Sequence, residues 1–513
     1  LEWNEESNYG GSMDRETEMG EDGSIMMFGR GDDFEYGGDS RNEGLPRAWT
    51  GGVNLGDKWK DNKNGANLSY RWRQLDARGG SISTSQFILP DTQYFNNEQT
   101  DFQSRKIQHK FNGSFDFQID SLTSMVVRSS GTVSSNQTEG QFVQEALDPA
   151  GNLVNDGNRI NTNDTKNFAL KNSILLRRKF EKKGRTLSLS LNQEYNRGEG
   201  DGILQNVNRF YKGGIPLGAD TTDQKKENKA KSNSLSGRLA ITEGIGKKGI
   251  VEWNYQYNNT RSENALLSFD KVNGAYTALN DSFSNSFLYK SSIHNTGLGY
   301  RYNHKKFGFG FGGNVAFSDW KLEDRLGTDN RNLNFTNFLG RANFNYKLAQ
   351  QSNIQFNYNA RTENPNMQQI QPLLNNNNPL FLQIGNPNLN IAFNQSIDLN
   401  FFDYKVLTGR NIYAGLYFST ISNAFSSSES VDELGRRISQ TVNVNGNYNL
   451  NGNIYYRKEI NKKGLGISSR MNFNTNRFKN IVNTIANVTN NSSYTGGFGF
   501  SNYNNEKFEF NVE

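Results

Sequence analysis

Long runs in which apolar and polar residues alternate one by one constrain the fold of this chain more than any other feature. The longest run extends over about 17 residues, from Thr441 to Arg457. Its apolar positions are Val442, Val444, Tyr448, Leu450, Ile454 and Tyr456, and asparagine occupies every odd position from 443 to 453. Successive side chains of a β-strand point to opposite faces, so such a run has one apolar and one polar face. Strands of soluble proteins usually have only about 5–6 residues.

The same pattern recurs along the chain. Leucines at 187, 189 and 191 alternate with serine, phenylalanines at 307, 309 and 311 alternate with glycine, and Ile354, Phe356 and Tyr358 alternate with asparagine and glutamine. A tilted strand needs about 9–11 residues to cross a membrane and can project further into solvent. The run lengths therefore favour membrane-crossing strands over the short strands of a soluble sandwich.

The composition excludes the two commoner classes of protein. Hydrophobic residues make up 34% of the 513 residues and the mean hydropathy is -0.79, whereas soluble domains contain about 45–50% apolar residues. Disorder fits poorly because aromatic residues reach 12% and the net charge is only +5. A transmembrane β-barrel remains, since its apolar residues face lipid in a thin band and its interior is polar. Closure of the barrel supplies the backbone hydrogen bonds that lipid cannot.

The connections between the runs are of two kinds. Short basic or glycine-containing turns lie at residues 60–65, 180–185, 246–249, 303–307, 460–464 and 504–507, with further members at 120–121, 348–353 and 405–411. Long connections rich in Asn, Asp, Ser and Gly cover residues 74–106, 134–165, 197–231, 259–288, 319–333, 362–392, 422–436 and 477–492. In outer-membrane barrels short turns face the periplasm and long loops face outside. Nine short turns with their flanking strands predict about 18 antiparallel strands.

The first residues differ from the rest of the chain. Residues 1–47 contain many acidic side chains among glycines and show no alternation. We predict an acidic, glycine-rich extracellular loop there and a barrel over residues 48–513. The carboxylates at residues 14–39 could attract cations weakly, but a solvated charge run is the commoner outcome.

A family resemblance adds to this interpretation. The stretch Arg361–Leu389 reads RTENPNMQQIQPLLNNNNPLFLQIGNPNL. It resembles a segment late in the barrels of TonB-dependent receptors of Bacteroidetes, the outer-membrane β-barrel protein family. Residues 46–59 (PRAWTGGVNLGDKW) and 175–196 (LLRRKFEKKGRTLSLSLNQEYN) are similar to an early strand and a mid-barrel hairpin of that family. Asn390, Ile391 and Ala392 stand where the family usually has Pro and an acidic residue, so the sequence departs from the family pattern at this point of the loop.

This loop contains the candidate ligand-binding residues. They are Arg361, Pro365, Pro372, Pro379, Gly385, Asn386, Pro387 and Leu389. Prolines and glycine are turn-formers, so a mainly structural role is favoured over direct contact with a ligand.

The resemblance implies more than the residues themselves show. It implies a barrel of about 22 strands, so roughly two strands would lie before Leu1 and two after Glu513, with a gap or seam between the first and last strands present. It also implies an N-terminal plug and coupling segment, absent from this chain, through which an inner-membrane TonB complex would act. The implied function is energy-coupled uptake of a siderophore, glycan, peptide or similar ligand across the outer membrane of a Gram-negative bacterium. Outer-membrane lipid and a surface lipoprotein are the other implied partners.

No residue pattern predicts catalysis, a cofactor or a metal site. The chain has no cysteine. His294 and His304 sit across a proposed hairpin, but with His109 they lack the further ligands that a metal site needs. Residues 148–156 (DPAGNLVND) lack the spacing of a calcium loop. The glycines at 308, 310 and 312 lie within an alternating strand, not before a helix, so they do not predict a dinucleotide site.

Two further features indicate a membrane protein and no nucleic-acid partner. The tryptophans at 3, 49, 59, 72, 253 and 320 are predicted to lie in interfacial girdles; Trp49 and Trp59 are about one crossing apart. Basic residues are balanced by acidic ones, 57 against 52, which argues against nucleic-acid binding.

Two alternative functions remain open at this point. A passive porin or export channel would share the barrel, and the native N-terminal sequence would distinguish it. A soluble cell-surface adhesin would instead bury its apolar faces in a dry core between two sheets and would be extracted without detergent.

Overall fold

The computed structural model describes residues 15–19, 25–29, 45–88, 93–327, 330–370, 374–376, 378, 380–431, 436–460, 464–504 and 508–512. Within these ranges no helix is long and apolar enough to cross a bilayer. Strands β1 (Arg15–Met19) and β2 (Ile25–Gly29) pair antiparallel in a separate two-stranded sheet. Other parts of the predicted acidic loop, residues 1–14, 20–24 and 30–44, lie outside the described residues.

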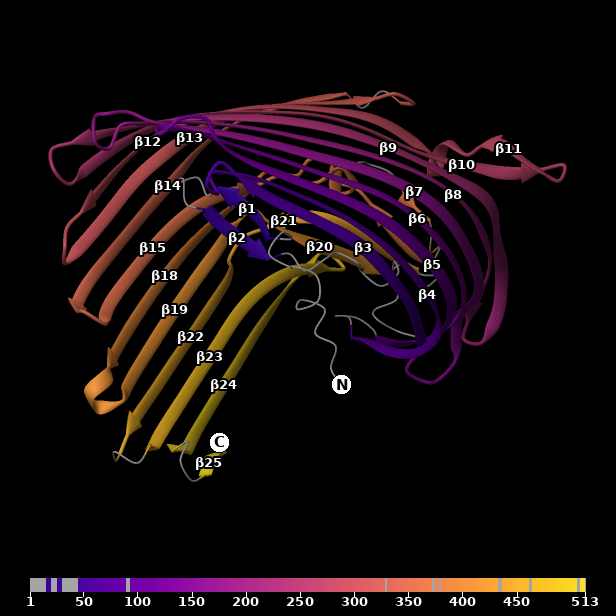
Figure 1. The fold of residues 1–513 in the computed structure, drawn as a ribbon. Coiled ribbons are helices and arrows are strands. Elements are labelled where there is room, and N and C mark those ends of the chain that lie inside the picture. Colours follow the sequence, from indigo (N-terminus) through magenta and orange to yellow (C-terminus); the bar gives the residue numbers. More distant parts are fainter. Residues whose placement is uncertain are drawn as a thin grey trace.

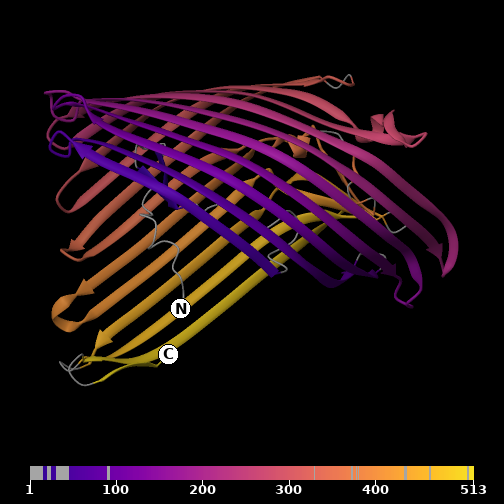
Figure 2. The same ribbon diagram turned by 45° about the vertical axis from the view of Figure 1, so that its right-hand side comes forward.

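Long antiparallel strands form a single curved wall (Figures 1 and 2). On one side they are β3 (Leu45–Trp59), β4 (Asn64–Ile88), β5 (Gln93–Gln118), β6 (Thr123–Leu147), β7 (Leu153–Lys179), β8 (Thr186–Lys212), β9 (Ile215–Ile245) and β10 (Gly249–Val272). They continue with β12 (Asn285–Asn303), β13 (Phe307–Asp324), β14 (Arg331–Ala349), β15 (Ser352–Glu363), β18 (Ala392–Lys405), β19 (Arg410–Ser422), β22 (Asn447–Glu459), β23 (Leu465–Val482), β24 (Ile485–Asn504) and β25 (Phe508–Val512). These eighteen wall strands of the described chain agree with the predicted number.

The nine predicted short turns fall between consecutive wall strands, although residues 461–463 and 505–507, in two of them, lie outside the described residues. They join β3 to β4, β5 to β6, β7 to β8, β9 to β10, β12 to β13, β14 to β15, β18 to β19, β22 to β23 and β24 to β25. Positive φ angles explain part of their composition: φ is 62° at Gly246 and 63° at Asn62. Glycine and asparagine tolerate this left-handed region better than other residues.

The long connections are built differently from the prediction. Most of residues 197–231 belongs to β8 and β9, which meet in a tight turn at Gly213 and Gly214. Strand β9 has 31 residues, whereas β15, β18, β19 and β22 have only 12–14. Above the membrane both faces of a strand are wet, so the apolar alternation fades while the backbone ladder continues. The wall is therefore tall on one side and low on the other.

Smaller elements occupy the remaining connections. They are β11 (Ala275–Leu279), η1 (Asp281–Phe283), α2 (Met367–Ile370), β16 (Leu374–Asn375), β17 (Phe381–Ile384), η2 (Val406–Thr408), β20 (Ala424–Val431) and β21 (Arg437–Val444). The prediction of one strand over residues 441–457 was wrong, because the run is divided between β21 and β22. Gly446 between them has a φ of 94°, which bends the chain so that β21 pairs with β20 instead of continuing the wall.

The two faces of the wall have opposite chemistry. Large apolar side chains such as Leu298, Phe311 and Phe338 are 58–66% exposed on the outward face. On the other face Asn314 donates hydrogen bonds to Asn254 at 2.8 Å and to Asn295 at 2.9 Å. An apolar outer band and an amide-rich lining are what a membrane barrel requires. The described residues contain no dry core between two sheets of the kind that a soluble adhesin would need.

The first and last wall strands meet with little pairing. The strand order returns from β25 to β3, so the wall closes into a barrel. Yet the register partners of β3 lie in β4 and those of β25 lie in β24, and no register pair joins β3 to β24 or β25 within the described ranges. Most side chains of β3 are exposed, including Leu55 at 65%. The predicted seam is therefore a weakly paired closure, not a break in the strand order.

Candidate functional site

The connection between β15 and β18 folds into the mouth of the barrel. We call residues 364–391 the strap; residues 371–373, 377 and 379 of it are not described. Ile370 and Leu389 of the strap pack against Phe287 on β12 and Leu322 on β13, and all four side chains are buried. These contacts fix both ends of the strap to the inner wall, because a buried apolar contact of this kind must be broken before the segment can leave.

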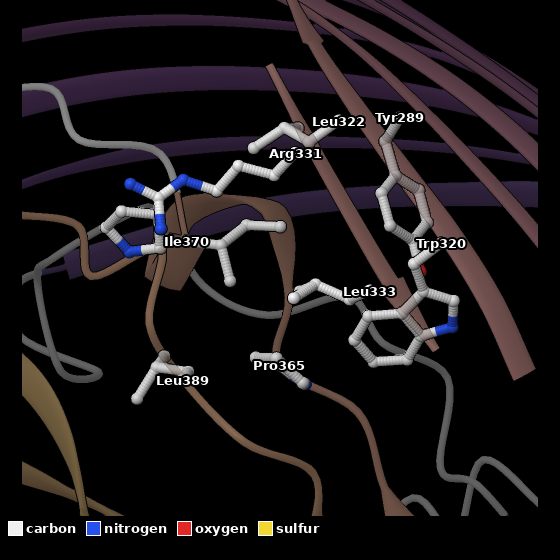
Figure 3. Close-up of a pocket in the computed structure, with 9 residues that line it drawn as sticks. Tyr289, Trp320, Leu322, Arg331, Leu333, Pro365, Ile370 and Leu389 are labelled. Carbon is white, nitrogen blue, oxygen red and sulfur yellow. The ribbon is translucent and has the colours of Figure 1, made fainter. Parts of the chain in front are cut away.

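A narrow apolar cleft lies beside these contacts. Figure 3 shows the wall residues, among them Tyr289, Trp320 and Leu333, facing the strap residues Pro365, Ile370 and Leu389. Strands β12, β13 and β14 supply the wall side. Trp320 is buried here, so its predicted place in an interfacial girdle was wrong; the strap covers it.

The middle of the strap reaches strand β9. Asn376 donates a hydrogen bond to Gln224 Oε1 at 3.0 Å and accepts one from the ammonium group of Lys226. Gln224 in turn donates to Asp270 on β10 at 2.7 Å. Leu380 approaches Gly157 on β7 so closely that a Cβ at 157 would lie 3.5 Å from it. The strap therefore contacts the inner wall from β13 to β7.

A hairpin made of β20 and β21, which we call the cap hairpin, lies beside the strap. Strand β21 pairs in parallel with β17 of the strap. Arg437 forms an ion pair with Glu429 at 2.7 Å and lies 4.8 Å from the ring centre of Phe381. Tyr94 on β5 is buried near this pair; burial raises the pKa of its hydroxyl to about 12, and the positive charge of Arg437 opposes that shift.

The structure places the candidate loop residues as follows. Pro365, Pro387 and Leu389 come together at the apolar cleft. Gly385 accepts a hydrogen bond from Gln440 at 3.2 Å, and Asn386 donates one to the carbonyl of Thr441 at 2.9 Å, so both attach the strap to the cap hairpin. Arg361 lies apart, on β15 opposite Asn394. Pro372 and Pro379 lie outside the described residues. These contacts agree with a structural role, and direct ligand contact stays a prediction.

An ion cluster lower on the inner wall was missed by the sequence analysis. Glu252 on β10 lies 3.4 Å from Arg341 on β14 and 3.6 Å from Arg238 on β9. Gly299 and Gly312 occupy the two strands between Glu252 and Arg341 in direct register, and their missing side chains leave room for the guanidinium group. The signal was the inward position of both glycines, which becomes visible only once the strands are in register.

The histidines are not brought together. His294 contacts the hydroxyl of Tyr255 at 2.8 Å, while His304 lies in a short turn against Phe307. His109 contacts the hydroxyl of Tyr70 at 2.9 Å. Among the residues that the structure describes, no group of three or more His, Cys, Asp or Glu could hold a metal ion.

The loop at residues 148–156 is also explained by local geometry. Asp148 accepts hydrogen bonds from the backbone N–H groups of Ala150 and Asn152 at 2.9 and 2.8 Å. A hydrogen bond from the side chain of Asn152 lowers the pKa of the Asp148 carboxyl most, and the backbone bonds lower it further. This is an Asx-type turn, as expected for a solvated outer loop.

A barrel with an apolar outer band, a polar lumen and backbone bonds satisfied strand to strand belongs to the outer-membrane class. The model of the outer membrane protein beta-barrel family matches residues 178–513, well over half of the chain. This protein therefore belongs to that family. It is a β-barrel of the outer membrane.

Solved structures with a similar arrangement are receptors and transporters. The copper transporter OprC is 9% identical with a TM-score of 0.49, and the match covers 90% of this chain and 65% of OprC. The alcaligin receptor FauA from Bordetella pertussis is 10% identical with a TM-score of 0.39, covering 91% and 73%. The RagAB peptide importer is 12% identical with a TM-score of 0.45, covering 83% and 51%. The chain thus spans about half to three quarters of these proteins. No curated protein matches the sequence.

Proposed function

We propose that this chain is the barrel wall of a TonB-dependent receptor of the Bacteroidetes type. Such a receptor takes up a siderophore, glycan, peptide or similar ligand with energy supplied from the inner membrane. The observation that supports this most is the structure of the mouth. The tall strands, the strap and the cap hairpin lie together on the side of the long connections.

The wall is taller than a membrane crossing requires. A crossing needs about 9–11 residues, whereas β9 has 31 and β7 and β8 each have 27. A passive pore needs strands that cross the lipid, and it does not need strands that extend so far beyond it. A receptor gains inner surface on which a ligand can be held before transport.

The segments inside the mouth also suit a receptor. The strap attaches to the wall strands β9 and β7 through Asn376 and Leu380, and Arg437 of the cap hairpin contacts Phe381 of the strap. Segments that occupy an entrance and are attached mainly by local contacts are suited to rearrange when a ligand binds. The proposal includes outer-membrane lipid around the wall, a TonB complex acting through an N-terminal region, and a surface lipoprotein at the mouth.

Uptake in living cells tests this proposal. The full-length protein would be produced in cells that lack their own receptors, and a panel of labelled ferric siderophores, short peptides and oligosaccharides would be offered. We expect uptake of one class, and we expect it to stop when an uncoupler collapses the proton gradient. Uptake that persists in the uncoupler would contradict energy coupling.

A passive porin or export channel is the second candidate because the lumen is lined by asparagines such as Asn254, Asn295 and Asn314. It predicts permeation of many small solutes with a sharp size limit and no dependence on the proton gradient. The same cells, offered neutral sugars of increasing size, give the comparison directly.

A further inference from the structure

The contact between the strap and β9 is polar and buried, and it places a lysine ammonium group against a neutral amide. Gln224 and Asn376 are each 2% exposed and Lys226 is 9% exposed. Lys226 donates to the amide oxygen of Asn376, and its ammonium group lies 5.6 Å from the ring centre of Phe283. The segment lies outside the membrane, because Lys226 is much further from the short turn at Gly246 than a crossing requires.

A neutral amide is a poor partner for a buried positive charge. Burying an ammonium group is costly unless an anion compensates it. The carboxylate that influences Lys226, Asp270, accepts hydrogen bonds from Gln224 and Asn280 at 2.7 Å each. Lys226 has no ion pair within the described part of the chain. Burial accordingly lowers the pKa of its ammonium group to about 8.

The amide of Asn376 is recognised at both ends. Its oxygen accepts from Lys226 and its nitrogen donates to Gln224 Oε1. The wall therefore presents a cationic donor beside a neutral acceptor. A carboxylate with an adjacent N–H or O–H group would satisfy both positions, and it would supply the negative charge that the asparagine lacks.

We infer that Lys226 and Gln224 form a recognition site for a carboxylate with a neighbouring N–H or O–H donor, and that Asn376 of the strap occupies this site until such a ligand displaces it. The chemistry is shared by the C-terminal residue of a peptide and by α-hydroxy carboxylates. The inference rests on the proposed function only in that a ligand reaches the mouth, because binding itself needs no energy coupling.

Removal of the competing side chain is the first test. Binding to the purified full-length protein in detergent would be measured by calorimetry with two probes, trialanine and citrate. Asn376→Ala should bind one of them about tenfold more tightly than the unaltered protein, since a hydrogen bond to a charged group is no longer opposed. Equal affinity of the two proteins, or binding of neither probe by Asn376→Ala, would overturn the inference.

Removal of the charge is the second test. Lys226→Met should lose at least about tenfold in affinity in the Asn376→Ala background. Lys225→Met is the matched control: Lys225 is the preceding residue of β9, points to the other face and pairs with Glu227 at 2.8 Å, so its loss should leave affinity unchanged. Lys226→Arg keeps the charge and should retain most of the binding. Heat-modifiable gel migration would show that each variant is a folded barrel.

The carboxylate and the neighbouring donor are tested separately, each with an analogue of one probe. Trialanine amide lacks the carboxylate, and tricarballylate lacks the hydroxyl group of citrate. A peptide site should reject the amide, and a hydroxy-acid site should bind tricarballylate at least about tenfold more weakly than citrate. Equal binding of a probe and its analogue would overturn the assignment. Successful binding here together with a failed uptake experiment would contradict the proposed function and leave this inference standing.

Discussion

Leu389 offers the sharpest test of how the strap is held. Its side chain is 2% exposed and packs among Phe287, Leu322 and Ile370. Replacement of a fully buried leucine by alanine costs about 2–5 kcal/mol. Because the strap is a connection and not one of the wall strands, the loss should appear in the docking of the strap and not in the barrel. Leu389→Ala should therefore raise the population of undocked strap by roughly 30-fold to several thousandfold.

Hydrogen exchange resolved by peptide measures this population directly. The N–H of Asn386 bonds to the carbonyl of Gln369, so exchange in the strap reports its docking. Leu326→Ala is the control, because Leu326 is 51% exposed in a wall-top turn. Exchange should accelerate over 380–390 in Leu389→Ala and stay unchanged in the control. Equal exchange in both variants, or acceleration spread over the whole barrel, would refute the idea of a separately docked strap.

Three further outcomes are expected. Docking of the strap should strengthen as pH rises from about 8 to 10.5, because burial lowers the pKa of Lys226 from 10.5 to about 8 and the docked form binds fewer protons in this range. The gain in docking free energy approaches about 3 kcal/mol. Proteolysis of the strap at several pH values should show this trend, and Lys226→Met should abolish it. Gly312→Val should lower stability by about 1–3 kcal/mol in thermal unfolding, since a Cβ would lie 2.8 Å from the carbonyl oxygen of Leu298, whereas Gly131→Val, with nothing within 4 Å, should not. Leu298→Arg on the lipid face should reduce barrel assembly by a cost of about 2–4 kcal/mol, and Leu326→Arg outside the membrane should assemble normally, as gel migration of membrane fractions would show.

The wall could be predicted from sequence because its rules are local. An alternating run and a short basic turn each fit within a few residues, and the seven predicted turns that the structure describes in full were placed correctly. The prediction weakened where the lipid ends. Beyond it both faces of a strand meet water, so residues 197–231 carry no alternation and their strands were not anticipated. Gly446 shows the opposite error, since alternation continued across a residue whose positive φ ends the strand.

The candidate site depends on contacts that no local pattern encodes. Asn376 meets Gln224 and Lys226 across about 150 residues of chain. A single inward lysine looks like any other lysine of a polar lining until the strap covers it. The family loop was recognised as a loop, but its docking against Trp320 follows from the curvature of the wall. The sequence therefore predicted the wall but not the docking of the strap and the cap hairpin inside it.

The unequal height of the wall gives the mouth a direction. Strands β4 to β10 rise far above the lipid, whereas β15, β18, β19 and β22 end early (Figure 1). A ligand that enters over the short strands meets the inner face of the tall strands on the opposite side. The strap and the cap hairpin both start from this low rim, so they stand in the path of entry. We expect a delivering partner to approach over β15–β22, and cross-linking from the two rims would reveal the preference.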